Sequence, residues 1–308
     1  MVKIFIDGEH GTTGLKIRKR LEMRNDLDIL SIPETEHRNI DFRTDCLRMA
    51  DIAILCLPDD AARKSVQLLE GYATRIIDTS TAHRIAPGWV YGFAEMTRNQ
   101  KQKIRDAQYV SNPGCYPTGA IAIIRPLREA GLLTADYPIS ISAVSGYTGG
   151  GKQLIAQMEN PSRPNAIHAN HFLYALTLEH KHVPEIMIHG QLSQPPVFTP
   201  GIGRFARGMV VCIPLHLRLL EKNIDLSAIY EIFHMHYQDY NMIEVAPYKE
   251  ILDTKYIDAE ELVQSDRIKI YITGSNGAKI VNFVAVLDNL GKGASGAAAQ
   301  NLDLMLKD

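Results

Sequence analysis

The sequence has few cysteines, and they are scattered. Cys46, Cys56, Cys115 and Cys212 are the only four among 308 residues, and no two form a C-x-x-C pair. This spacing speaks against a zinc ribbon and contains no disulfide pattern. We therefore expect a protein of the reducing cytoplasm.

An excess of one charge and long apolar runs are also lacking. Lysine plus arginine number 33 and aspartate plus glutamate 35, a formal net charge of -2. This balance of charges creates no positive electrostatic field that would hold a polyanion, so nucleic acid is not an expected partner. No segment approaches the length of a membrane span, and the start MVKIFIDGEHG lacks the features of a targeting signal. We expect neither membrane insertion nor secretion.

What is present is the composition of a globular protein. Hydrophobic residues make up 45% and charged residues 22%, far from the mixture that keeps chains unfolded. A chain of 308 residues is long enough for two domains or one large domain.

The first third alternates between strand and helix patterns. Short apolar strands are expected at 2–6, 28–32, 52–58 and 75–80, and helical runs at 15–24, 42–50 and 60–72 separate them. This alternation predicts an α/β domain with a doubly wound, Rossmann-like parallel sheet.

The pattern changes after about residue 137. Segments rich in β-branched residues follow, with one long helix at about 225–239, which predicts an α+β domain with a mainly antiparallel sheet. Asn276-Gly277 predicts a two-residue hairpin turn with positive φ at both positions. We expect a nucleotide-binding domain over 1–114, completed by a C-terminal helix over 290–308, and a catalytic and oligomerisation domain over 115–289.

A glycine loop joins the first strand to the first helix. Gly8, Gly11 and Gly14 place backbone N–H groups and a helix N-terminus where a pyrophosphate could bind, although a tight turn without a ligand is the simpler alternative. The second strand ends without the acidic residue typical of NAD sites. Ser31 stands there, and Arg38 is close by. We therefore predict NADP, with a solvated loop charge as the alternative role of Arg38.

Cys115 lies in a distinctive setting, SNPGCYPTGAIAIIRPL. Residues that interrupt regular secondary structure precede it, and an apolar helix is expected from about Thr118. Positive partial charge at a helix N-terminus stabilises a thiolate, so Cys115 is a possible nucleophile. A buried structural cysteine is the alternative, and the other three cysteines are expected to be small core residues.

A cysteine nucleophile needs a base, and the stretch LEHKHVPEI offers one. If the segment is helical, His182 and Glu185 share a face, so that His182 exchanges protons and Glu185 orients it. His180 is the rival base. A metal site built on His180 and His182, or on His168 and His171, lacks further ligands at suitable spacing, so no metal is expected.

Three more features suggest anion binding. The glycine-rich run from Ser145 to Lys152 could present N–H groups to an anion, or could simply be a flexible loop. Arg84 and Arg207 stand beside strands and could bind a substrate carboxylate or phosphate, or form surface ion pairs.

Several motifs together resemble the N-acetyl-γ-glutamyl-phosphate reductases in their shorter form. They are SNPGCYPTGA, SGYTGGGK, HKHVPEI, the Arg-Gly pair at 207–208 and DNLGKGASGAAAQNL, in this order over nearly the whole chain. Aspartate-β-semialdehyde dehydrogenase and glyceraldehyde-3-phosphate dehydrogenase are more distant relatives. The sequence departs from the family in a shortened middle region and in the EHGTT wording of the first glycine loop.

The resemblance implies reduction of N-acetyl-γ-glutamyl phosphate by NADPH in arginine biosynthesis, by a homodimer or homotetramer. It makes Cys115 the nucleophile and a histidine of the H-x-H-x-P-E segment the acid–base group, which we place on His182 with His180 in reserve. Another phosphorylating semialdehyde dehydrogenase, acting on aspartate semialdehyde, or a non-catalytic NADP-binding protein are the alternatives. The predicted cofactor contacts are Gly8, Gly11, Thr12, Thr13, Gly14, Ser31, Arg38, Pro58, Ser145, Gly146 and Gly149, and the substrate contacts are Arg84, Asn112 and Arg207.

Overall fold

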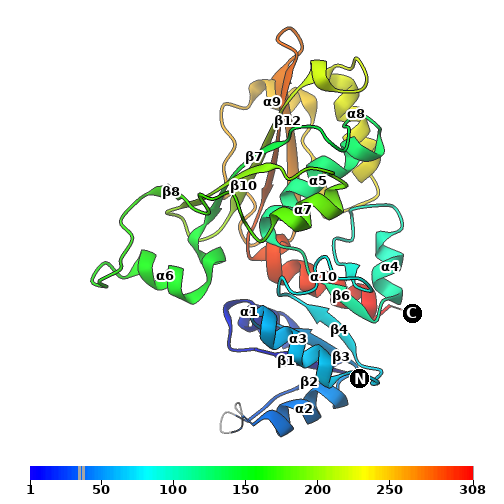
Figure 1. Ribbon diagram of the computed structural model, residues 1–308, viewed down its shortest axis with the longest axis vertical. Helices are drawn as coiled ribbons and strands as arrows, with labels where there is room; N and C mark the ends of the chain where they lie inside the picture. The colour runs from blue at the N-terminus through cyan, green and yellow to red at the C-terminus, as the bar shows by residue number, and fades with distance from the viewer. Residues whose placement is uncertain (34–35, 37–38, 308) are drawn as a thin grey trace. The chain divides into compact units, whose positions relative to one another are not determined.

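The computed structural model describes residues 1–33, 36 and 39–307, except for the side chain of Leu252. The chain divides into two compact units (Figure 1). Unit 1 comprises Met1–Ala94, Arg98–Pro113 and Ala294–Asp308, and unit 2 comprises Glu95–Thr97 and Gly114–Gly293.

Unit 1 is built on a six-stranded sheet in the order β2-β1-β3-β4-β6-β5, and every pair of neighbours is parallel. The predicted doubly wound parallel sheet is therefore confirmed. Its strands are β1 (Val2–Asp7), β2 (Leu27–Leu30), β3 (Ile52–Leu55), β4 (Arg75–Asp78), β5 (Val90–Tyr91) and β6 (Tyr109–Ser111).

Helices cover both faces of this sheet, because alternate residues of each buried strand point to opposite sides. In β1, Ile4 and Ile6 belong to one apolar cluster and Phe5 to another. The first cluster includes residues of α1 (Thr12–Leu21), α4 (Gln100–Asp106) and α10 (Gly296–Met305). The second includes residues of α2 (Ile40–Met49) and α3 (Asp59–Leu68). The C-terminal helix α10 is thus part of the unit 1 core.

Three strands end earlier than the sequence analysis predicted, at Leu30, Leu55 and Asp78. The differences have local causes at the carboxyl ends of the strands. Pro58 is the N-cap of α3, and the Asp78 carboxylate accepts the Ser80 N–H at 2.9 Å, which turns the chain. The edge where ligands bind in such sheets therefore consists of loops.

Unit 2 is built on a seven-stranded sheet in the order β11-β12-β13-β10-β7-β9-β8. Four of its neighbouring pairs are antiparallel and two are parallel, so the predicted mainly antiparallel sheet is also confirmed. The strands are β7 (Ser140–Gly146), β8 (His171–Leu173), β9 (Val197–Gly203), β10 (Met209–His216), β11 (Ile243–Val245), β12 (Ile268–Ser275) and β13 (Ile280–Leu287).

Helix α5 (Cys115–Glu129) is the central helix of unit 2, and its residues from Tyr116 to Ile124 are all buried. Gly119 lets it approach the sheet closely, since a Cβ there would lie 2.8 Å from a Val211 methyl carbon. The predicted long helix is α8 (Leu226–Tyr237). Unit 2 also contains the shorter helices α6 (Gly151–Glu159), α7 (Val183–Gly190) and α9 (Tyr248–Asp253), which were not predicted as helices.

The predicted hairpin exists, but its predicted turn is wrong. Ser275 pairs with Ile280, so the loop has four residues rather than two. The positive φ falls on Lys279, at 54°, and not on the Asn-Gly pair. Asn276 is used differently, because its Oδ1 accepts the Leu226 N–H at 3.0 Å at the start of α8.

Candidate active site

The glycine loop of unit 1 has the tight geometry that a nucleotide cradle requires. Gly8 has a φ of +89°, and a Cβ there would lie 2.5 Å from the Cys56 carbonyl oxygen. A Cβ at Gly14 would lie 2.3 Å from the Gly8 carbonyl oxygen, and Gly11 is the N-cap of α1. Thr12 and Thr13 begin a first turn with no acidic residue, so its N–H groups remain suited to an anion.

The residue before this loop carries a charge that the sequence analysis did not consider. The buried Asp7 carboxylate accepts hydrogen bonds from Arg43 Nε and Nη2, both at 2.8 Å, and from Ser65 Oγ at 3.0 Å. The ion pair neutralises a carboxylate that would otherwise repel a pyrophosphate on the adjacent loop. This ion pair could not be predicted from the sequence, because Arg43 lies 36 residues from Asp7.

At the end of β2, the structure provides a cation that the sequence analysis missed. Ser31 Oγ accepts a hydrogen bond from Arg18 Nη1 at 2.7 Å, and Arg18 also pairs with Glu9 and Glu22. Arg38, which we predicted for this role, lies outside the described residues. The basic run in α1 was the available signal for Arg18.

Pro58 also lies at this edge of the sheet, between β3 and α3. The next residue, Asp59, accepts the Thr81 N–H at 3.0 Å, which joins this loop to the one after β4. The glycine loop, Ser31 and Pro58 therefore occupy the carboxyl ends of three neighbouring strands, the position where open α/β sheets bind ligands.

Cys115 is the first residue of α5, three residues earlier than the predicted start of the helix. The first N–H groups of a helix have no acceptor within it, so those of Cys115 and Tyr116 can stabilise negative charge, whereas Pro117 has none. The N-cap residue Gly114 donates its N–H to Glu185 Oε1 at 2.8 Å, and Glu185 is only 1% exposed. Glu185 therefore holds the residue that precedes Cys115.

The other thiols lie in surroundings that disfavour ionisation. Burial raises the pKa of Cys56 to about 12 and also raises the pKa values of Cys46 and Cys212. This matches their expected role as small core residues.

The two predicted histidines lie beside this helix start. Helices α5 and α7 pack together (Figure 1). His182 is the N-cap of α7. The His182 ring centroid lies 5.9 Å from that of Tyr116 and 4.6 Å from that of His180. The residue after Cys115 thus contacts the predicted base directly.

His180 is engaged by neighbouring groups. Its Nδ1 accepts the His182 N–H at 3.0 Å, and its Nε2 lies 3.4 Å from the Tyr174 hydroxyl. Burial, with a smaller effect of Lys181, lowers its pKa from 6.5 to about 4. His180 is therefore neutral near pH 7, and Nε2 carries its proton.

Tyr174 belongs to the same cluster. Burial raises its pKa to about 12, and negative charge on Cys115 acts in the same direction. Tyr174 was not among the predicted site residues. Its position between two short polar segments carried no recognisable signal.

The second glycine run is explained at least in part by packing within unit 2. A Cβ at Gly146 would lie 2.6 Å from the Ala206 carbonyl oxygen, and one at Gly149 would lie 3.1 Å from Asn289 Nδ2. Ser145 is buried, and its hydroxyl lies 3.2 Å from the Gly146 carbonyl oxygen. These contacts make a rigid turn at the end of β7.

The three predicted substrate residues all have partners within their own units. Arg84 Nε donates to the Asn112 carbonyl at 3.0 Å, and the Asn112 side chain donates to the Ala294 carbonyl at 3.0 Å. Arg207 forms an ion pair through two nitrogens with the buried carboxylate of Asp288. Each of these three side chains therefore has a polar partner within the protein.

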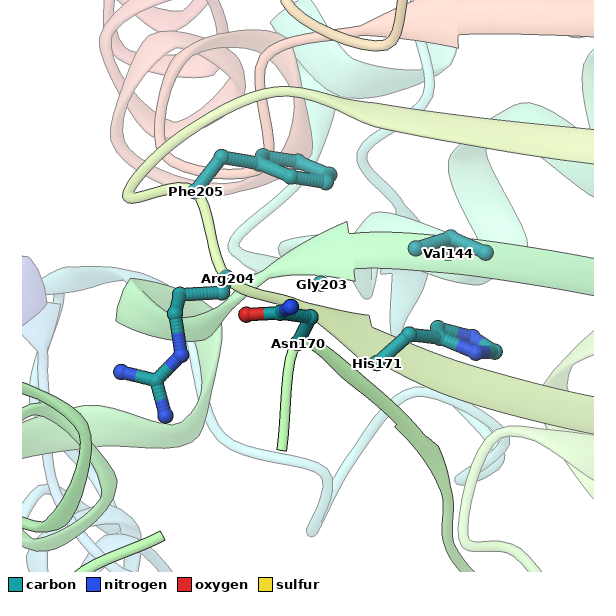
Figure 2. A pocket seen from close by; sticks show the side chains of 6 residues that line it. All are labelled: Val144, Asn170, His171, Gly203, Arg204 and Phe205. Atoms are coloured by element: carbon teal, nitrogen blue, oxygen red, sulfur yellow. The ribbon is translucent and has the colours of Figure 1, made fainter. Parts of the chain in front are cut away.

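A separate hollow in unit 2 contains the histidine of the alternative metal site (Figure 2). Figure 2 shows His171 and Arg204 on opposite sides of this hollow of about 470 Å³, with Asn170 between them. Arg204 donates to the carbonyls of Met158, Ala169 and Ile167, so it braces the preceding loop. Among the described residues, no group of three or more His, Cys, Asp or Glu is placed to hold a metal ion.

Comparison with known families defines the class of protein. The NAD binding domain of semialdehyde dehydrogenases matches residues 4–104, and the dimerisation domain of semialdehyde dehydrogenases matches residues 115–289. The chain belongs to the semialdehyde dehydrogenase family.

Similar curated proteins narrow the relationship. The chain is 59% identical over 305 residues to the N-acetyl-gamma-glutamyl-phosphate reductases of Brucella anthropi and Brucella suis, covering 99% of this chain and 98% of each relative. The resemblance predicted from the motifs is thereby confirmed.

Solved structures share the fold at much lower identity. Aspartate semialdehyde dehydrogenase II from Vibrio cholerae has a TM-score of 0.74 at 15% identity over 100% of this chain and 98% of that one. Aspartate semialdehyde dehydrogenase with NADP from Candida albicans has a TM-score of 0.64 at 12% identity over 99% and 98%. In the described part of this chain, no helix is long and apolar enough to cross a bilayer.

Proposed function

We propose that this chain reduces N-acetyl-γ-glutamyl phosphate with NADPH to N-acetylglutamate semialdehyde and phosphate. One observation carries the proposal. Cys115 begins α5 in the same cluster as His182, and Glu185 ties its N-cap residue Gly114 to the first turn of α7. The names of the similar reductases supply the substrate.

The chemistry begins at the sulfur. The Cys115 thiolate attacks the acyl phosphate carbon, the carbon–oxygen bond to phosphate breaks, and a thioester forms. The proposal places the oxyanion of this step at the N-terminus of α5, where the helix dipole favours negative charge. When bound, NADPH supplies a hydride to the thioester carbon.

We assign the proton transfers to His182. It protonates the oxygen of the thiohemiacetal that results from reduction, and it takes the proton back as the carbon–sulfur bond breaks and the aldehyde leaves. His180 is unsuited to this task because its Nδ1 already accepts the His182 N–H. Its role in the proposal is to hold the backbone of His182.

We assign nucleotide binding to residues 1–114 with 290–308, and catalysis to 115–289. The fit of the glycine cradle at Gly8, Gly11 and Gly14 supports the nucleotide, together with Thr12, Thr13 and Pro58 at the same edge. We propose NADP rather than NAD because Arg18 lies on Ser31 at the end of β2, where a ribose 2′-phosphate binds in such folds. Ser145, Gly146 and Gly149 remain proposed cofactor contacts.

We further propose that the enzyme is a homo-oligomer of the cytoplasm. The match of residues 115–289 to a dimerisation domain supports the oligomer, and four free cysteines are consistent with a reducing compartment. Sedimentation velocity tests whether the chain forms a homo-oligomer, and a single monomeric species at micromolar concentration would refute this.

A comparison of three substrates tests the proposed reaction. Phosphate-dependent NADP reduction is measured with N-acetylglutamate semialdehyde, aspartate semialdehyde and glyceraldehyde 3-phosphate. We expect turnover with the first. Preference for either of the others would overturn the proposed substrate, and turnover with none would refute the reaction itself.

A further inference from the structure

A π-helical turn begins beside the proposed nucleophile, and its first three residues belong to unit 2. It spans Gly291–Ser295, and its first and third N–H groups, those of Gly291 and Gly293, both donate to the Asp288 carbonyl, at 3.1 and 3.0 Å. Turns of this kind are rare and often occur at functional sites. The predicted function makes no use of this turn.

Gly293 forms a wall against Cys115. A Cβ added at Gly293 would lie 2.8 Å from Cys115 Cβ and 3.1 Å from the Asp288 carbonyl oxygen. Real Cβ atoms do not approach so closely, so no side chain fits between this turn and the start of α5. The position of the turn therefore limits the directions in which the Cys115 side chain can point.

The residue next to this wall is anchored by a buried ion pair. Lys292 Nζ lies 2.8 Å from Glu95 Oε2, and each side chain is only 1% exposed. Glu95 begins the segment Glu95–Thr97, which belongs to unit 2 although the chain on both sides of it belongs to unit 1. The pair thus joins two segments that are 197 residues apart.

Stability alone does not account for such a pair. Desolvating two charges costs free energy that their attraction only partly returns, and a well-packed apolar pair is often as stable. What a buried ion pair adds is a defined geometry, because each charge has one place where it is compensated. Here Lys292, one of the two charged residues, directly precedes Gly293.

We propose that Lys292 and Glu95 are positioning residues, which hold Gly293 against Cys115 and so direct its sulfur. The proposal rests on the proposed role of Cys115 as nucleophile. It predicts that the reactivity of the thiol, and not only the stability of the fold, depends on this turn.

The test uses three variants of the full chain. Gly293→Ala keeps both charges and displaces only the wall, K292M/E95M replaces the pair by apolar side chains, and Gly277→Ala is the matched control. A Cβ at Gly277 would meet nothing closer than Ser275 Oγ at 3.9 Å. The measurements are kcat, KM for NADPH, the melting temperature, and the rate of Cys115 alkylation by iodoacetamide at several pH values, located by peptide mass spectrometry.

We expect Gly293→Ala and K292M/E95M to lower kcat by about 100-fold, as for a reacting group displaced by about 1 Å. Both variants should also slow the alkylation of Cys115, because its rate depends on the thiolate fraction and on access to the sulfur. KM for NADPH should not change in either variant, and Gly277→Ala should match the wild type in every measurement. A folded Gly293→Ala enzyme with wild-type kcat and alkylation rate would overturn the proposal, as would full activity of K292M/E95M. Alkylation needs no substrate, so a slowed thiol in a chain that turns over none of the three substrates would leave this inference standing while the proposed function fails.

Discussion

The pKa of His180 makes its replacement the sharpest test of the histidine assignments. We consider His180→Asn, because an asparagine Oδ1 can accept the His182 N–H as His180 Nδ1 does, at 3.0 Å, but does not titrate. In the folded chain the pKa of His180 is lowered from 6.5 to about 4, chiefly by burial. The unfolded chain therefore takes up a proton near pH 6.5 that the folded chain refuses until about pH 4.

The direction in which pH changes the stability follows from this difference in pKa. As the pH falls below about 6.5, the unfolded state gains protons that the native state does not bind, so wild-type stability decreases. Between pH 7.5 and 5.0 the unscreened loss is about 2 kcal/mol, and because His180 is only half-buried, solvent screening reduces it to about 1 kcal/mol. His180→Asn should lack this part of the loss.

Urea unfolding followed by circular dichroism at pH 7.5 and 5.0 measures the effect, with His168→Asn at an exposed position as the control for losing an imidazole. An equal loss of stability in wild type and His180→Asn would refute the reasoning.

The same variant separates the two histidines in catalysis. His180→Asn should retain the acidic limb of the kcat profile, and His182→Asn should abolish it; the reverse result would transfer the proton role to His180.

Three further predictions concern the sulfur and the nucleotide. Cys115→Ser should lower turnover by about 1,000-fold or more while NADPH binding, measured by fluorescence titration, persists; near-normal turnover would eliminate the thioester route. Gly14→Ala should weaken NADPH binding by about 10-fold or more in the same titration, because its Cβ would lie 2.3 Å from the Gly8 carbonyl oxygen; wild-type affinity would contradict the cradle. Arg18→Ala should raise KM for NADPH by about 10-fold or more and leave KM for NADH unchanged, since a charge-assisted contact is lost; equal effects on both would remove Arg18 from the 2′-phosphate site.

The features that could be predicted from sequence are those with a local physical cause. The glycines of the first loop are needed because each approaches a backbone atom a few residues away or on the next strand. Cys115 stands out because Gly114 and Pro117 mark a helix start on either side of it. The period of the apolar residues was likewise enough to distinguish the parallel sheet from the mainly antiparallel one.

The features that were missed depend on partners far apart in the chain. Asp7 and Arg43 are separated by 36 residues, Lys292 and Glu95 by 197, and neither pair has a recognisable spacing. The prediction of a two-residue turn at Asn276 was wrong for a related reason. Its side chain accepts the Leu226 N–H from a segment 50 residues away, so a tertiary bond replaced the local turn preference.

Glu185 makes a tertiary contact that its spacing from His182 did not predict. Helical spacing from His182 predicted that its carboxylate orients the histidine, and it does lie in the first turn of α7. Its Oε1 accepts the Gly114 N–H at 2.8 Å, on the residue before the nucleophile. One buried carboxylate therefore joins the start of the helix that carries Cys115 to the start of the helix that His182 caps. This bond between two helices helps to place Cys115 relative to His182, and the H-x-H-x-P-E spacing alone could not predict it.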